Sequence, residues 1–228
     1  MLKTTNTTTP PPRVVIIGAG YAGALVARSL EGDAKANKLK VTIVERRDAV
    51  HHKIGAIRAS VRAGEWTDRV RIPLSRVIKH ARIIVGDVLT VDQEAKLIKF
   101  RDDSQPPLPF DILVCATGTL NHSPGDLPAD LRTKDEVRSY FRMTASAIKD
   151  AKDILLVGGG ASAVEYAGEI RETYPDKPIT IMCSAAHLLT SSVAPISPKF
   201  LKQLYDILEK KNIKLIRGEK VVKPADVE

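Results

Sequence analysis

The chain has 228 residues, 43% of them hydrophobic, and its 35 Lys and Arg outnumber its 27 Asp and Glu to give a formal net charge of +8. These values are ordinary for a soluble globular protein and leave room for a sizeable core. The sequence contains no apolar run of the roughly 20 residues that cross a bilayer, and its first twelve residues lack the pattern of a secretory signal. We therefore expect a cytoplasmic protein whose membrane contact, if any, is peripheral.

Positive charge is concentrated in two segments. Residues 46–82 contain ten Lys or Arg against three acids, and residues 199–223 contain eight against three. Such clusters favour anionic partners, which include cofactor phosphates, lipid head groups and nucleic acid. A solvated basic face without a dedicated ligand explains the same pattern equally well.

Residues 1–12 are rich in Thr and end in three prolines, so we expect a disordered leader. An apolar strand begins at Arg13 and leads into glycines, and a segment with helical periodicity follows from Tyr21. A second apolar strand covers Lys40–Glu45. Strand, glycine turn, helix and parallel strand together predict a βαβ unit, which carries ligands at the carboxyl ends of its strands.

Gly18, Gly20 and Gly23 form a G-x-G-x-x-G pattern in the turn of this unit. The first glycine permits a tight turn, the second lets the backbone approach a pyrophosphate, and the third lets helix and strand pack closely. Glu45 ends the second strand 22 residues after Gly23, where a carboxylate can accept hydrogen bonds from an adenosine ribose. We predict that the unit binds FAD through Gly18, Ala19, Gly20, Tyr21, Ala22, Gly23, Glu45 and Arg46.

The pattern returns in residues 153–183, with Gly158, Gly160 and Ala163 in the turn. This internal repeat predicts a second dinucleotide site, for NADH or NADPH, rather than one sheet in which a single glycine turn serves packing only. The expected acid is absent, because the second strand ends in Cys183 and Ser184. No Arg immediately follows to bind a 2′-phosphate either, so both nicotinamide cofactors stay open.

Other segments complete an α/β fold of two Rossmann-like domains with parallel sheets. Strands are expected within residues 81–100 and 109–118, an amphipathic helix over 197–211, and a short strand over 212–217. Both cysteines, Cys115 and Cys183, lie in apolar runs, so we expect two buried free thiols and no metal site. The predicted domains are a leader (1–12), an FAD-binding domain (13–125), a connecting helical segment (126–150) and a truncated NAD(P)-binding domain (151–228).

Four segments resemble a known superfamily: VVIIGAGYAG near the amino end, HHKIGAIRASV from His51, ILVCATGT from Ile112 and VGGGASAVEYAGEI from Val157. With them the chain resembles the FAD- and NAD(P)-binding pyridine nucleotide-disulphide oxidoreductases. Within that superfamily it is most similar to the apoptosis-inducing factor 2 (ferroptosis-suppressor quinone reductase) and type II NADH dehydrogenase families. The resemblance implies an enzyme that passes electrons from NAD(P)H through flavin to a quinone.

The resemblance also implies roles for single residues. Arg58 would contact FAD, and the backbone of Ile84 would pack against the adenine. The paired His51 and His52 would lie near the flavin ring, although such pairs are more often structural. The strand-end residues that would lie close to the flavin, at the crossing between the domains, are Ala116, Thr117 and Gly118.

Glu165 is predicted in the first turn of the second glycine helix, where an acid suits the helix dipole. A pyrophosphate would face the same turn, however, and a like charge there is unfavourable. The resemblance implies that the matching Glu lies between nicotinamide and flavin. We predict Glu165 as the catalytic residue, which positions the nicotinamide or handles a proton.

Relatives in these families continue beyond the matched region with the rest of the NAD domain, a Gly-Asp segment for the flavin chain and a membrane-docking interface. We therefore expect a fragment, or a truncated form with impaired FAD retention. The alternative function is a non-catalytic nucleotide-binding or nucleic-acid-associating relative of apoptosis-inducing factors. The absence of a C-x-x-C motif argues against a disulfide reductase.

Overall fold

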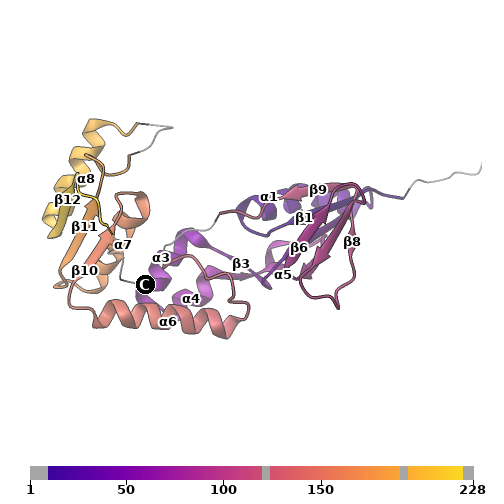
Figure 1. Cartoon of the computed structure of the whole chain (residues 1–228), viewed down its shortest axis with the longest axis horizontal. Coiled ribbons are helices and arrows are strands. Elements are labelled where there is room, and N and C mark those ends of the chain that lie inside the picture. Colours follow the sequence, from indigo (N-terminus) through magenta and orange to yellow (C-terminus); the bar gives the residue numbers. More distant parts are fainter. Residues whose placement is uncertain (1–9, 120–123, 191–194, 223–228) are drawn as a thin grey trace, which may run out of the picture. The chain divides into compact units, whose positions relative to one another are not determined.

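The computed structural model describes residues 10–119, 124–190 and 195–222 (Figure 1). These residues form two compact units that interleave along the chain. The described residues of unit 1 come from segments 10–52, 69–119 and 130–134, and those of unit 2 from segments 53–68, 124–129 and 135–222. The predicted domains are consecutive instead, and the bounds of the cofactor-binding domains stay a prediction.

Unit 1 is built on a parallel four-stranded sheet of order β5-β2-β1-β9. Side chains alternate across the central strand, so that Val14 and Ile16 join one buried cluster and Val15 and Ile17 join another. This burial on both faces explains the unbroken apolar run of the strand. The strands are β1 (Arg13–Ile17), β2 (Lys40–Glu45), β5 (Arg82–Val85) and β9 (Ile112–Cys115).

Shorter elements complete unit 1. An antiparallel sheet contributes Ile98 and Phe100 to the cluster around Val15, and a second antiparallel pair joins β3 to β4. The antiparallel strands are β3 (Ala49–His51), β4 (Arg71–Pro73), β6 (Val88–Asp92), β7 (Leu97–Phe100) and β8 (Leu108–Pro109). The helices are α1 (Tyr21–Ser29), α2 (Glu31–Lys35) and α5 (Leu74–Val77), and α1 packs against β1 and β2.

Unit 2 contains a parallel three-stranded sheet of order β10-β11-β12. Its strands are β10 (Ile154–Val157), β11 (Ile179–Cys183) and β12 (Ile213–Arg217). Its helices are α3 (Lys53–Arg62), α7 (Ala161–Thr173), α8 (Pro198–Lys210) and all but the first residue of α6 (Lys134–Asp150). Helix α4 (Glu65–Val70) begins in unit 2 and ends in unit 1.

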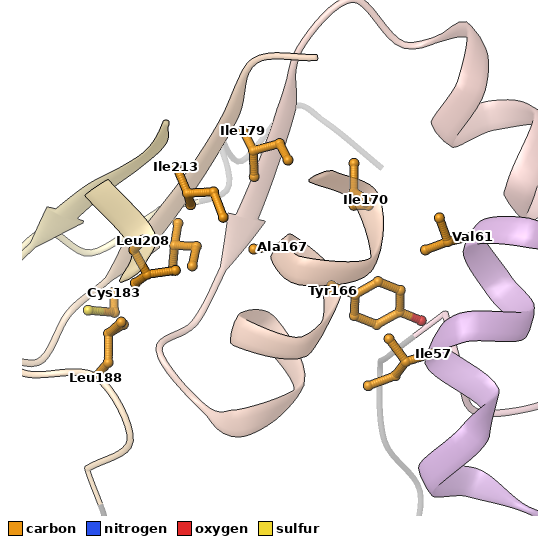
Figure 2. Packing of buried hydrophobic residues seen from close by; sticks show 11 residues of the cluster. Ile57, Val61, Tyr166, Ala167, Ile170, Ile179, Cys183, Leu188, Leu208 and Ile213 are labelled. Atoms are coloured by element: carbon orange, nitrogen blue, oxygen red, sulfur yellow. The ribbon is translucent and has the colours of Figure 1, made fainter. Parts of the chain in front are cut away.

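Helix α7 is packed on two sides. Figure 2 shows Tyr166 projecting toward Ile57 of α3, while Ala167 faces the strands that carry Ile179 and Ile213. A hydrogen bond of 2.8 Å joins the buried Tyr166 hydroxyl to the hydroxyl of Ser60. The α3 segment therefore belongs to the same core as the second glycine unit, although Ser60 and Tyr166 are 106 residues apart in sequence.

Several predicted elements are confirmed. Both βαβ units form, the 197–211 segment is a helix capped by Ser197, and β12 lies within 212–217. One prediction is wrong: Cys183 is buried, but Cys115 is exposed, because its strand β9 is an edge of the four-stranded sheet as described. The leader lies largely outside the described residues, and no described helix is long and apolar enough to cross a bilayer.

Arg13 ties the start of β1 to the segment before β9. Its guanidinium bonds both carboxylate oxygens of Asp111, at 2.8 and 3.0 Å, and its amide donates to Asp111 at 2.7 Å. The side-chain hydrogen bond from Arg13 first, and the backbone amide second, hold the pKa of Asp111 well below its usual range. A depressed carboxyl pKa adds stability above the unfolded value of about 3.9, and that stability is lost as pH falls through the folded value.

We therefore expect Asp111→Asn to lower the melting temperature at about pH 7, and the difference from wild type to shrink at about pH 3. Thermal unfolding followed by circular dichroism at both pH values measures it. Asp103→Asn, an exposed carboxylate nearby in sequence, is the matched control. A difference from wild type that is equal at both pH values would contradict the ion-pair explanation.

The core of unit 2 generates a second prediction. Ile181 is 0% exposed in β11, whereas Val157 on the neighbouring strand is 62% exposed. Ile181→Ala should lower the free energy of unfolding by about 2–5 kcal/mol, because it leaves a cavity. Val157→Ala should change it by no more than about 0.5 kcal/mol. Urea unfolding measures the free energy of unfolding of both variants. Equal losses in Ile181→Ala and Val157→Ala would show that the sheet is not packed as described.

Candidate nucleotide-binding sites

The glycine turn of unit 1 places each glycine under a different constraint. Gly18 has φ +96°, and a Cβ built on it would lie 2.3 Å from the carbonyl oxygen of Ala116. A Cβ on Gly23 would lie 1.9 Å from the carbonyl oxygen of Gly18. A Cβ on Gly20 would meet nothing within 4 Å. The first and third glycines are therefore required by packing, whereas the second borders open space where a ligand can approach the backbone.

The helices that follow the two glycine turns begin in the same way. Gly20 is the N-cap of α1 and Gly160 is the N-cap of α7, and neither cap has a side-chain hydrogen bond. Neither helix carries an acid in its first turn, although α2, α4 and α6 do. The amino ends of α1 and α7 therefore keep their partial positive charge for an anion.

Glu45 supports the first turn directly. Its Oε2 accepts a hydrogen bond of 2.8 Å from the amide of Ala19, and its Oε1 accepts one of 3.3 Å from the amide of Arg47. A carboxylate has further acceptor capacity, so the predicted bonds to a ribose are compatible with this role. The structure nevertheless reveals a function that the sequence did not indicate: Glu45 holds the glycine turn in place.

Charged side chains follow the ends of β2 and β5. Arg46 lies 3.7 Å from Asp87 and Arg132 lies 2.5 Å from the same carboxylate, while Arg47 donates to the carbonyl of Leu131 at 2.8 Å. Sequence reasoning missed Asp87 and Arg132. The position of Asp87, two residues after the end of β5, could have identified it as a strand-end residue near the turn. Arg132 is distant in sequence, so no local pattern pointed to it.

The predicted strand-end residues, 116–118, lie against the first glycine turn. The amide of Ala116 donates to Ile17 at 2.8 Å, which places residues 116–118 beside Gly18. Thr117 is exposed, and Gly118 has φ +74° with open space around it. Ile84 pairs with Val44 in the sheet, and its side chain packs beside the cluster around Val15.

Tyr21, the first residue of α1, is 50% exposed and contacts His52, the second of the paired histidines. A hydrogen bond of 2.7 Å joins its hydroxyl to Nδ1 of His52, and the two rings meet edge to face with centroids 5.9 Å apart. Both residues belong to unit 1. The aromatic ring is therefore held at the open end of the glycine turn by a partner 31 residues away.

The second glycine turn differs in one respect. Gly158 has φ +114°, and a Cβ on either Gly158 or Gly160 would meet nothing within 4 Å. The close contact falls on Gly159, whose Cβ would lie 2.8 Å from that of Cys183. Sequence reasoning missed Gly159, although the run of three glycines was visible. Because the tight packing is at Gly159, the helix position taken by Gly23 in the first unit can be Ala163 here.

Glu165 does not lie where the sequence placed it. It is the fifth residue of α7 after the cap Gly160, so it is in the second turn, and it is exposed. The predicted conflict between Glu165 and a phosphate at the helix start therefore does not arise. Its proposed role near a nicotinamide stays a prediction.

Arg58 belongs to unit 2, and Gly18 belongs to unit 1. Its guanidinium bonds Glu169 at 2.7 and 2.8 Å and lies 5.0 Å from the centroid of the Trp66 ring. The hydrogen bond to Glu169, and then the charge of Glu169, raise the pKa of Arg58 above its ordinary value. Arg58 therefore links α3 to α7, and its predicted contact with FAD stays a prediction.

Residues 12–227 match the pyridine nucleotide-disulphide oxidoreductase family. The chain belongs to that family. It is 34% identical over 226 residues to apoptosis-inducing factor homolog B of Dictyostelium discoideum, a match covering 96% of this chain and 55% of the relative. It is 30% identical over 209 residues to ferroptosis suppressor protein 1 of Xenopus tropicalis, covering 92% and 53%. The predicted family is thus confirmed, and the chain spans about half the length of these curated relatives.

Solved structures of low sequence identity share the fold of this chain. The water-forming NADH oxidase of Lactobacillus brevis, bound to NADH, superposes with a TM-score of 0.69 at 19% identity, over 92% of this chain and 47% of the oxidase. The sulfide:quinone oxidoreductase of Aquifex aeolicus gives 0.67 at 18% identity, over 93% and 53%. The predicted α/β fold with Rossmann-like parallel sheets is confirmed.

The contrast between Gly20 and Gly23 can be tested. Gly20→Ala should leave the free energy of unfolding within about 0.5 kcal/mol of wild type but weaken FAD or ADP binding on the order of tenfold, because the methyl group enters the ligand space. Gly23→Ala should cost about 1–3 kcal/mol of stability as well, since the backbone must move. Urea unfolding and equilibrium titration with ADP measure both. Undiminished ADP binding by Gly20→Ala would place the nucleotide elsewhere.

Proposed function

We propose that this protein is an FAD-dependent oxidoreductase that oxidises NADH or NADPH and reduces a quinone. The observation that carries the proposal is the pair of βαβ units, each with a glycine turn open at the second glycine and a helix start free of side-chain caps and acids. Two such units suit two dinucleotides. In the overall reaction, NAD(P)H, one proton and a quinone give NAD(P)+ and a quinol, so the two electrons balance.

The first glycine turn fits the pyrophosphate of FAD. Open space at Gly20, the exposed amino end of α1 and the support of Ala19 by Glu45 together form a cradle for an anion. Bound FAD would supply the two-electron carrier between the nicotinamide and the acceptor. FAD would be bound by the strand-end and glycine-turn residues of unit 1, which are Gly18 to Gly23, Glu45, Arg46, Ile84 and Ala116 to Gly118. Tyr21 would cover one side of the turn.

The second turn, at Gly158 to Ala163, would bind the pyrophosphate of the nicotinamide cofactor. Glu165, exposed one turn further along α7, would position the nicotinamide or hold a proton. The family resemblance implies that Arg58 contacts FAD. The quinone acceptor is supported by the resemblance to the ferroptosis-suppressor family and by the sulfide:quinone oxidoreductase of the same fold.

One set of measurements on the full chain tests the proposal. After purification in the presence of FAD, the absorption spectrum should show bound flavin, and NAD(P)H should be oxidised when a water-soluble quinone is added. Binding to duplex DNA is measured in parallel at several salt concentrations. A chain without flavin and without NAD(P)H oxidation, but with DNA affinity that falls steeply with salt, would overturn the enzyme proposal in favour of a basic binding protein.

Glu165→Gln tests the proposed catalytic residue. It should lower kcat about 100-fold or more while leaving the dissociation constant of the nicotinamide cofactor unchanged, because the change removes charge but little volume. Glu172→Gln, on the same helix and exposed, is the control and should retain wild-type kcat. Stopped-flow flavin reduction gives the rate, and an unchanged rate in Glu165→Gln would remove this residue from the mechanism.

A further inference from the structure

The two βαβ units share a backbone geometry that allows residue-by-residue comparison. The amide of Gly18 donates to Val44 at 2.8 Å, and the amide of Gly158 donates to Met182 at 2.8 Å. Glu45 follows the acceptor Val44, and Cys183 follows the acceptor Met182, so Glu45 and Cys183 occupy equivalent positions in the two units. In the next strand, Glu45 pairs with Val85 and Cys183 pairs with Arg217, so Val85 and Arg217 are equivalent too.

The charges at these equivalent positions are opposite. Unit 1 carries an acid at Glu45 and an apolar side chain at Val85, whereas unit 2 carries the uncharged Cys183 and the cation Arg217. Strand ends of this kind face the adenosine ribose of a bound dinucleotide. An acid there accepts hydrogen bonds from a free 2′-hydroxyl, whereas an Arg accommodates a 2′-phosphate.

Arg217 is held at this strand end by neutral groups. It donates to the carbonyl of Ala186 at 3.1 Å, and its guanidinium lies 5.0 Å from the centroid of the Tyr205 ring. The Tyr205 hydroxyl in turn accepts from the amide of Leu188 at 3.2 Å. Within the ranges that the structure describes, no carboxylate forms an ion pair with Arg217, so its charge is not neutralised.

The loop that Arg217 contacts lies directly against the second glycine turn. The amide of Leu189 donates to the carbonyl of Gly159 at 2.7 Å, and Gly159 packs against Cys183. The pyrophosphate turn and the end of β11 are thereby fixed relative to one another. Residues 184–190 contain no acid, and Ser184, which follows Cys183, is exposed.

We infer that Arg217 binds the 2′-phosphate of NADPH and makes this protein prefer NADPH to NADH. The inference rests on the proposed function, since it assigns the second glycine turn to a nicotinamide dinucleotide. Arg217 lies in β12, and β11 separates that strand from β10, which leads into the glycine turn. Arg217 therefore supplies the cation that the loop after β11 lacks. A guanidinium is suited to this task, because it offers several donors in one plane to phosphate oxygens.

Calorimetric titration of the full chain with 2′-phospho-ADP-ribose and with ADP-ribose tests the inference. The two ligands differ only in the 2′-phosphate, and neither needs flavin or electron transfer. We expect wild type to bind the phosphorylated ligand on the order of tenfold more tightly or better. Arg217→Gln should lose that preference and keep its affinity for ADP-ribose. Lys214→Gln, which removes an exposed charge from the same strand, should retain the preference.

Equal affinity of wild type for both ligands, no binding of either, or a preference that survives in Arg217→Gln would overturn the inference. If Arg217→Gln melts at a lower temperature, Arg217→Lys replaces it; this variant should keep a preference that is reduced but measurable. The inference and the proposed function fail separately. A preserved 2′-phosphate preference in a chain that oxidises no NADPH would leave the site assignment standing and remove the activity.

Discussion

A single backbone hydrogen bond, made twice, organises this protein. In each unit the amide of the first glycine donates to a carbonyl near the end of the neighbouring strand, that of Val44 in the first unit and of Met182 in the second. This bond holds the glycine turn at the carboxyl ends of the strands before the helix begins. The positive φ angles of Gly18 and Gly158 follow from that bond and the direction change after it. The helix then starts without a side-chain cap or an acid, so its suitability for an anion comes from chain geometry rather than from charged side chains.

The same turn is stabilised differently in the two units. In the first, Gly18 and Gly23 allow close backbone packing and Glu45 bonds the amide of Ala19. In the second, Gly159 packs on Cys183, and the loop amide of Leu189 bonds Gly159. The two units therefore share the backbone geometry of the turn, while the residues that surround and support it differ.

Much of this arrangement was predictable because it is local. Strand, glycine turn and helix at residues 13–29 and 154–173 follow from apolar runs and glycine spacing, and the helix at 198–210 follows from its periodicity and its Ser-Pro start. The errors arise where the answer depends on distant residues or on exact boundaries. Arg217 was overlooked because only strand pairing brings it beside Cys183. Cys115 is exposed because its strand lies at an edge of the sheet. Glu165 lies in the second turn of α7 rather than the first because the helix begins at Ala161.

The segment between β3 and β4 gives the molecule an unusual connectivity. The chain leaves unit 1 after His52, builds α3 into the core around Tyr166, and returns at Arg69 to pair β4 with β3. Neither unit is a continuous stretch of sequence, so no single cut divides the chain into two self-sufficient halves. A cut after residue 68, at the end of the segment that carries α3, would separate Ile57 and Val61 from the core around Tyr166 to which they belong.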